Sequence, residues 1–139
     1  EGIKELEGIK TPIIKNNCSH VFYILGLVID FELLGTTRQK IFDALVAEGL
    51  QGLIPGYANI HMLPIFQQKI AYGSKGFPWT EDFCRQDINY SKGICPIAEE
   101  LHDKNFLGYE MCLHDLSDED INLIIQAFHK VWDNLPKLS

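Results

Sequence analysis

The stretch "CSHVFYILGLVID", residues 18–30, decides how the rest of the chain can fold. Aromatic and β-branched residues fill most of its positions, which is typical of a strand that is buried on at least one face. The run closes at Asp30, and the following "FELLG", residues 31–35, supplies a turn. We therefore expect one long strand over residues 18–30, with the other elements arranged around it.

A helix and a second strand are expected after that turn. Thr36 and Gln39 have the spacing of a capping box, the next apolar residues fall on one helical face, and Gly49 suits the left-handed position after a helix. The short apolar run "LQGLI", residues 50–54, predicts a strand that stops at Pro55. Upstream, residues 1–10 resemble the frayed end of a helix, with glycines at positions 2 and 8.

The second half predicts three helices and one strand. Short helices are expected over residues 64–73 and 96–105, each opened by a proline, and a third strand over residues 106–115. Residues 74–92 between them are irregular and rich in aromatic side chains. The final helix has the strongest signal, because Ser117 and Asp120 form a capping box ahead of an apolar stripe that reaches Leu135.

This order of elements predicts a single α+β domain over residues 1–139. Strand, helix, strand, two small helices, strand and helix describe a small, mostly antiparallel sheet with helices packed on one face. The chain has 139 residues, 46% of them hydrophobic, which suffices for one core. No internal repeat or low-complexity linker divides it.

Charge and composition exclude several classes of function. The net charge is -7 and the basic residues are scattered, so we expect no nucleic acid partner and no attachment to an anionic membrane. No apolar run reaches the ~20 residues of a bilayer span, and no signal peptide is evident, so we expect a cytoplasmic protein. The four cysteines never form C-x-x-C and are expected to be free thiols packed as small apolar groups.

The loop "GYANIHMLPIF", residues 56–66, is the first candidate site. Gly56 and Pro64 favour a non-repetitive backbone, and such a loop places polar rings where a ligand can accept their hydrogen bonds. Tyr57 and His61 are therefore candidate binding residues. His20 is a third candidate, because a polar ring just before a strand can point from the sheet edge into a cleft, although capping the strand is an equally good account.

Other chemistry is weakly supported by the sequence. The chain contains no dinucleotide-binding, phosphate-loop, nucleophile-elbow or zinc-protease motif, and the acidic residues of "AEEL" and "SDEDIN" suit helix starts rather than a catalytic pair. Two cysteines and two histidines lie within one short region and could converge on a zinc ion, although their spacings match no known zinc-binding motif. Those residues are Cys95, His102, Cys112 and His114.

The ordered set of motifs resembles the C-terminal small domain of the DegT/StrS-type aminotransferases. These motifs are "SHVFYILGLVID", "RQKIFDALVAEGLQGLIPGY", "IHMLPIF", "CPIAEEL" and "LSDEDINLIIQAFHKV". The resemblance runs from about residue 10 to residue 135 and depends on order and spacing rather than on any one motif. It implies a fold like the small domain of fold-type I aminotransferases, with residues 1–15 as a linker tail and 16–139 as the domain.

The resemblance also implies a function. Family members use pyridoxal phosphate to move an amino group, from glutamate or glutamine, onto a keto-sugar nucleotide or ketocyclitol, and they work as homodimers. Tyr57, His61 and His20 would then face the substrate. The Schiff-base lysine and the cofactor-binding groups belong to the family's N-terminal domain, so this chain is expected to contribute no catalytic residue, to bind no metal or cofactor alone, and to be inactive as a fragment.

A second interpretation remains open. Small α+β domains of this size also occur as free-standing modules that bind a small ligand or regulate another protein without catalysis. The absence of Met at position 1 favours the fragment.

Overall fold

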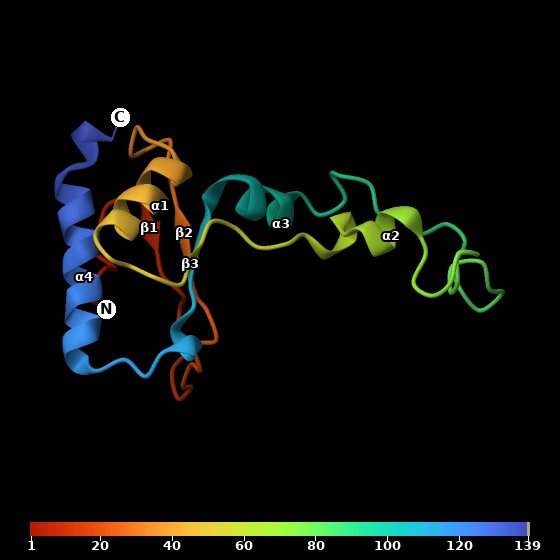
Figure 1. Ribbon diagram of the computed structural model, residues 1–139, viewed down its shortest axis with the longest axis horizontal. Coiled ribbons are helices and arrows are strands. Elements are labelled where there is room, and N and C mark those ends of the chain that lie inside the picture. Colours follow the sequence, from red (N-terminus) through yellow and green to blue (C-terminus); the bar gives the residue numbers. More distant parts are fainter. Residues whose placement is uncertain (139) are drawn as a thin grey trace. The chain divides into compact units, whose positions relative to one another are not determined.

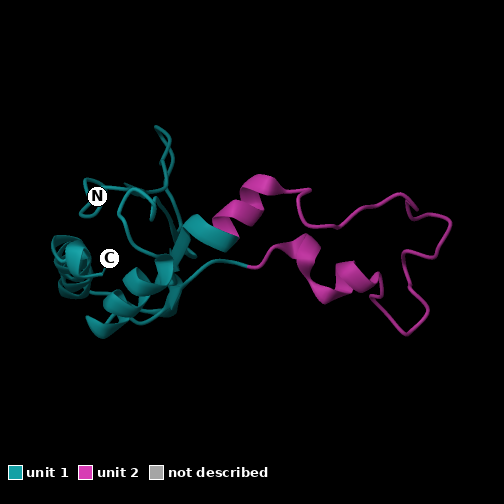
Figure 2. Cartoon of the chain, turned by 90° about the horizontal axis from the view of Figure 1, so that it is seen from above, with its two compact units in different colours: residues 1–57, 103–139 teal, residues 58–102 magenta. Residues whose placement is uncertain are grey.

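The computed structural model describes residues 1–138 (Figure 1). The chain divides into two compact units, which Figure 2 distinguishes by colour. Unit 1 contains residues 1–57 and the chain from residue 103 onward, whereas unit 2 contains residues 58–102. The expected assignment of the whole chain to one domain of a larger protein stays a prediction.

Unit 1 is built on a four-stranded antiparallel sheet in the order β1-β2-β4-β3. The sheet confirms the predicted α+β class. Its strands are β1 (Ile9–Lys10), β2 (Leu25–Ile29), β3 (Leu53–Ile54) and β4 (Phe106–Tyr109).

The central pair, β2 and β4, has one face that is fully apolar. Leu27 lies opposite Leu107 and Leu25 lies opposite Tyr109, and side chains of such opposed residues point to the same face of a sheet. Leu27 and Leu107 are 0% exposed. This face is the centre of the core.

The opposite face of the same pair is occupied by glycine. Gly26 lies opposite Gly108, and a Cβ on either residue would lie 3.0 Å from an atom of the Phe106 ring. A Cβ on Gly108 would also lie 2.6 Å from Ile54. The Phe106 ring therefore covers both glycines, and neither position has room for a side chain.

Two helices complete unit 1. Helices α1 (Arg38–Ala47) and α4 (Asp118–Asp133) contact each other and share one apolar core with the strands (Figure 1). Ser117 and Asp120 form the predicted capping box of α4. The stripe of α4 buries Phe128, Val131 and Trp132. No helix described between residues 1 and 138 has both the length and the hydropathy to cross a bilayer.

Several predicted boundaries of unit 1 are wrong. The expected strand over 18–30 is formed only at 25–29, and the expected strand over 106–115 stops at Tyr109, followed by a 3-10 turn at Met111–Leu113. Strand β2 begins and strand β4 stops at the Leu25–Tyr109 pair, because the pairing between the two strands extends no further in that direction. Residues 1–10 form turns and strand β1 rather than the end of a helix.

The ends of both long helices also differ from the prediction. Thr37, not Thr36, caps α1 and accepts the Lys40 amide at 3.3 Å, because the Thr36 hydroxyl instead donates to the Leu138 carbonyl at 2.8 Å. Gly49 has φ +98°, the predicted left-handed position. The α4 helix ends at Asp133, and Leu135–Lys137 forms a separate 3-10 turn.

Unit 2 consists of short helical segments joined by irregular chain. These are the 3-10 turn Ile60–Met62, helix α2 (Pro64–Gln68) and helix α3 (Pro96–Glu100). A π-helical turn at Leu101–Asn105 follows α3 and continues into unit 1. Both prolines open their helices as predicted. Helix α2 is shorter than expected, because Lys69 adopts a left-handed conformation with φ +53° and donates its ammonium to the Ile88 carbonyl at 3.0 Å.

The two units are stabilised in different ways. All the buried hydrophobic residues lie in unit 1, and Glu99 is the buried residue among the described residues 58–102. The aromatics of unit 2 pack on one another instead, with the Phe66 ring in contact with Trp79 and Tyr90. The Trp79 indole also donates to the Tyr90 hydroxyl at 3.0 Å. A second set of contacting rings is formed by Tyr72, Phe77 and Phe83. Polar contacts and these two aromatic clusters therefore replace a core there.

Replacing Leu27 with Ala is expected to lower the free energy of unfolding by about 2–5 kcal/mol, because the cavity lies at the centre of the core. Leu33→Ala is the matched control, since Leu33 is 60% exposed. It should change that free energy by less than about 0.5 kcal/mol. Urea unfolding followed by circular dichroism measures both variants, and equal losses would contradict the assigned core.

Candidate functional site

His61 is held by a buried carboxylate within unit 2. Its Nε2 lies 2.8 Å from Oε1 of Glu99, and the two side chains are 10% and 8% exposed. Because an ionised carboxylate only accepts hydrogen bonds, Nε2 carries the proton in this pair. The imidazole is therefore fixed in orientation, and its Nδ1 is left as the nitrogen that can meet a ligand.

The backbone of the loop before α3 also binds Glu99. The Gly93 amide donates to both carboxylate oxygens at 2.8 Å, and the Cys95 amide donates to Oε1 at 3.2 Å. Burial acts to raise the pKa of Glu99, but the hydrogen bonds from Gly93, Cys95 and His61 outweigh it and lower the pKa below its usual value. Glu99 is thus an ionised anchor for three separate donors.

Gln67 fixes the backbone around the same histidine. Its side-chain amide donates to the His61 carbonyl at 2.7 Å and to the Tyr90 carbonyl at 2.6 Å. Both ends of the His61 residue are therefore held, the ring by Glu99 and the carbonyl by Gln67. A ring held in this way suits a binding role, because little conformational freedom remains to be lost when a ligand arrives.

Tyr57 lies at the end of unit 1 and is 55% exposed. Its nearest chemical partner is Tyr23, whose pKa is raised above its usual value by the charge of Tyr57 and by a side-chain hydrogen bond with it. Tyr23 is itself 61% exposed. Two neighbouring phenols therefore stand at the surface of unit 1, a pair that the sequence did not reveal.

His20 stands apart from the sheet. It lies five residues before β2 begins, is exposed, and stacks on the Phe22 ring with centroids 4.0 Å apart. It therefore does not sit at the edge of a strand, as its sequence position suggested. Its substrate-binding role stays a prediction.

The three predicted residues are thus divided between the units. Tyr57 and His20 belong to unit 1, and His61 belongs to unit 2. Their grouping around one substrate stays a prediction.

The sequence predicted that the carboxylates of "AEEL" lie at a helix start and bind backbone amides, and Glu99 does accept a hydrogen bond from the Cys95 amide. Its contact with His61 spans 38 residues of sequence and carries no local signal.

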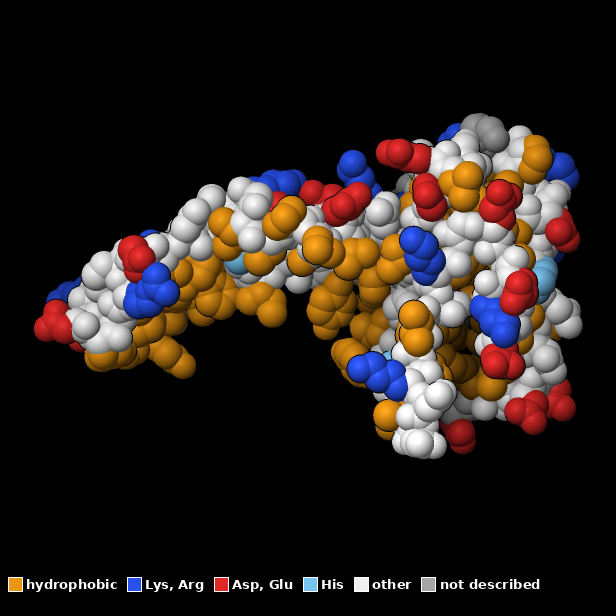
Figure 3. All heavy atoms as spheres, turned by 180° about the vertical axis from the view of Figure 1, so that it is seen from behind, with side chains coloured by type: hydrophobic (Ala, Val, Ile, Leu, Met, Phe, Trp, Pro, Cys, Tyr) orange, Lys and Arg blue, Asp and Glu red, His pale blue; other side chains and the backbone are white. Residues whose placement is uncertain are grey.

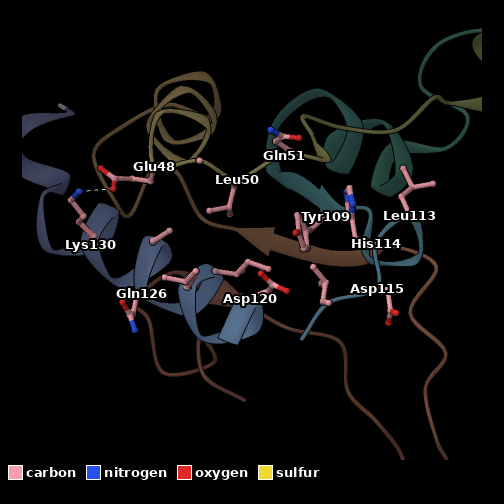
Figure 4. A pocket seen from close by; sticks show the side chains of 15 residues that line it. Glu48, Leu50, Gln51, Tyr109, Leu113, His114, Asp115, Asp120, Gln126 and Lys130 are labelled. Carbon is pink, nitrogen blue, oxygen red and sulfur yellow. Dashed lines mark hydrogen bonds and ion pairs between the residues drawn. The ribbon is translucent and has the colours of Figure 1, made fainter. Parts of the chain in front are cut away.

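A pocket of about 780 Å³ opens in unit 1 (Figure 4). It is bordered by residues 48–51 just after α1, by Tyr109 of β4, by residues 113–116 and by α4 between residues 120 and 130. Its polar lining includes Glu48, Tyr109, His114, Asp115, Asp120 and Lys130. No local sequence signal indicates this pocket, since its lining comes from residues far apart in the chain.

Thiols and metal ligands are not clustered. The four cysteines are free, but three of them are exposed, so the prediction that they pack as small apolar groups is wrong. Throughout the described residues 1–138, no three His, Cys, Asp or Glu side chains gather closely enough to hold a metal ion. The zinc interpretation therefore has no geometric support in this part of the chain.

Comparison with known proteins gives limited information. No protein-family model matches the chain. An uncharacterized protein of Methanocaldococcus jannaschii, MJ1066, is 26% identical to it over 89 residues. The match covers 64% of this chain and 23% of that protein, so the chain spans only that share of the relative's length.

The hydrogen bonds to Glu99 are expected to depend on pH. Because the pKa of Glu99 is lowered in the folded state, its stabilising effect is present above the usual carboxyl pKa of about 4.3 and is lost as the pH falls through the lower folded value. Protection of the Gly93 and Cys95 amides from hydrogen exchange, corrected for intrinsic rates, should fall over that range.

The matched variants are Glu99→Gln and Glu100→Gln, since Glu100 is the exposed neighbour in the same helix. Glu99→Gln should remove the pH dependence and lower the protection already at pH 7. Glu100→Gln should behave as the unsubstituted chain. Unchanged protection in Glu99→Gln would show that the carboxylate does not hold this loop.

Proposed function

We propose that this chain is the C-terminal small domain of a DegT/StrS-type, pyridoxal-phosphate-dependent aminotransferase. The parent protein would move an amino group from glutamate or glutamine onto a keto-sugar nucleotide or ketocyclitol. The observation that carries the proposal is the bond between His61 and Glu99. His61 belongs to the "IHMLPIF" motif and Glu99 to the "CPIAEEL" motif, so this hydrogen bond brings two of the quoted motifs into direct contact.

The arrangement of elements supports the same proposal. The four-stranded antiparallel sheet with α1 and α4 is compatible with the small domain of fold-type I aminotransferases. Three of the quoted motifs coincide with the expected kinds of element: a helix with its glycine turn, a proline-opened α3 and a final capped helix. The motif "SHVFYILGLVID" contains β2, although its aromatic residues precede the strand. The match to 23% of a longer relative is also compatible with a chain that is one part of a larger protein.

Unit 2 has a surface that suits contact with another protein body. Many of its hydrophobic side chains are open to solvent, and Figure 3 shows apolar atoms along it, at the left of that view. The most exposed are Ile60, Tyr72, Phe83 and Ile97, at 66%, 75%, 77% and 76%. Apolar surface of this extent is typical of interaction sites. A catalytic body or the partner subunit of a homodimer would cover it.

The role of this chain would be to bind and orient the substrate. With its proton on Nε2, the fixed His61 ring accepts a hydrogen bond at Nδ1, which suits a sugar hydroxyl, and the Tyr57 hydroxyl can also donate to a phosphate oxygen. His20 would be a third donor at the surface of unit 1. Closure of such a domain over a substrate also excludes water from the reaction.

The cofactor does not fit the residues of this chain. Lys130 lines the pocket of unit 1, but it pairs with Glu48, and Asp115 and Asp120 make the lining acidic. An acidic lining repels the phosphate of pyridoxal phosphate. We therefore assign the cofactor, and the electron sink that it supplies when bound, to the remainder of the parent protein.

The alternative is a free-standing module that binds a small ligand without catalysis. The pocket of unit 1 favours it, because a cavity of this size can hold a small molecule without any other domain. The genomic sequence distinguishes the two: a long upstream region with a Schiff-base lysine supports the aminotransferase, whereas a start codon immediately before Glu1 supports the module.

Substitution of His61 tests the proposed role directly. In the protein that contains this chain with its upstream region, His61→Ala should raise the KM for the keto-sugar substrate by roughly 10–100-fold with a smaller change in kcat, because a ground-state contact is lost. The control is His129→Ala, an exposed histidine of α4 that contacts the Gly2 carbonyl. It should leave both constants unchanged.

The isolated chain gives a complementary test. Mixed with pyridoxal phosphate and reduced with borohydride, it should show no saturable labelling of a single lysine. Stoichiometric labelling at one lysine would overturn the assignment of the cofactor to the rest of the protein. Equal effects of His61→Ala and His129→Ala would overturn the role of His61.

A further inference from the structure

The pocket of unit 1 carries a second binding site that the proposed function does not use. Figure 4 shows its labelled side chains, which come from the chain just after α1, from β4, from the loop before α4 and from α4 itself. Its volume of about 780 Å³ falls in the range of small-molecule sites. All its lining residues belong to unit 1, so the site is complete within that unit.

The charge of the pocket lining indicates the charge of the ligand that the pocket favours. Glu48, Asp115 and Asp120 face the pocket with Lys130 as the one ammonium group among its described lining residues. Lys130 is paired with Glu48, so its charge is already compensated. The other two carboxylates have no cationic partner in the lining. The pocket is therefore net negative, which disfavours phosphates and carboxylates and favours a cation.

Asp120 is held in its ionised form. The Ser117 hydroxyl and amide donate to its Oδ2 at 2.7 and 2.9 Å, and these hydrogen bonds lower the pKa of Asp120. They leave Oδ1 without a hydrogen bond from the described residues. The capping box thus fixes a carboxylate whose second oxygen remains available to a ligand.

Tyr109 provides an independent sign that the pocket is built to bind. It is only 5% exposed, it lines the pocket, and its hydroxyl makes no hydrogen bond to the described residues. Burial, and then the charge of Asp120, raise the pKa of Tyr109, so the hydroxyl stays neutral. The ring is almost buried, but the hydroxyl is not among the buried polar atoms that lack a partner, so it is open to the pocket, where a ligand can bind it.

The remaining walls are aliphatic. Leu113 and Leu123 line the pocket although 64% and 63% of their surface is exposed, and Ile124 lies beside them on α4. Leucine side chains left open at a pocket mouth gain from contact with an apolar ligand body. The lining thus combines carboxylates with aliphatic side chains.

We propose that this pocket binds a small organic cation, an ammonium group attached to an aliphatic or ring-shaped body. The ammonium group binds the free Oδ1 of Asp120, with Asp115 adding negative charge at the pocket rim. The Tyr109 hydroxyl bonds to a polar group of the ligand, and the body covers Leu113 and Leu123. This site does not depend on the proposed aminotransferase function, because no residue of the His61 group takes part.

Three probes with the same ring test the charge preference. Cyclohexylmethylamine, cyclohexylmethanol and cyclohexanecarboxylate are titrated into the 139-residue chain at pH 7, and binding is followed by amide chemical shifts in two-dimensional NMR. The amine should bind saturably, at least about 10-fold more tightly than the carboxylate, since hydrogen bonds to charged groups are the strong ones. The shifts should centre on residues 113–124.

Two variants locate the site, and one controls for general attraction to an acidic protein. Asp115→Asn should weaken binding of the amine by about 5-fold or more, and Tyr109→Phe should weaken it by about 3-fold or more. Asp133→Asn removes the same charge from an exposed position of α4 outside the pocket and should have no effect.

Three results would overturn the inference. These are equal binding of the three probes, amide shifts centred outside residues 113–124, and equal weakening by Asp115→Asn and Asp133→Asn. Failure of this test leaves the proposed aminotransferase function intact, because that proposal is measured by the effect of His61→Ala on KM.

Discussion

The antiparallel pairing of β2 with β4 is the constraint on which unit 1 depends. These strands lie at the centre of the sheet, and their alternate residues Leu27 and Leu107 are the fully buried floor under α1 and α4. The same pairing places Tyr109 at the end of β4, where its ring contributes to the core and its hydroxyl reaches the pocket. The core and the pocket are therefore set by one register.

Unit 2 is organised on another principle. Its buried centre is a carboxylate rather than an apolar cluster, and Glu99 holds His61, Gly93 and Cys95 by directed hydrogen bonds. Hydrogen bonds of this kind specify geometry but contribute less to stability than apolar burial does. The unit thus combines a precisely placed histidine with an exposed apolar surface, and both features suit a segment that completes its packing against another body.

Local signals in the sequence predicted much of this fold, and long-range contacts account for what they missed. The capping box at Ser117, the left-handed Gly49 and the proline-opened α2 and α3 were all predicted, because each depends on neighbouring residues. The strand over 18–30 was predicted too long, since propensity does not reveal where a partner strand ends. Glu99 and Tyr109 were missed as site residues for the same reason: their roles arise from residues distant in the chain.

The paired glycines of β2 and β4 have a consequence for misfolding. A slip of the two strands by two residues would keep every leucine on its own side of the sheet. Apolar burial alone therefore favours the native register over this slipped one only weakly. In that arrangement Gly26 and Gly108 would no longer face each other, and the Phe106 ring would meet side chains instead of the space above both glycines. The paired glycines therefore help to specify the register of β2 and β4, and they disfavour the two-residue slip that apolar burial alone would allow.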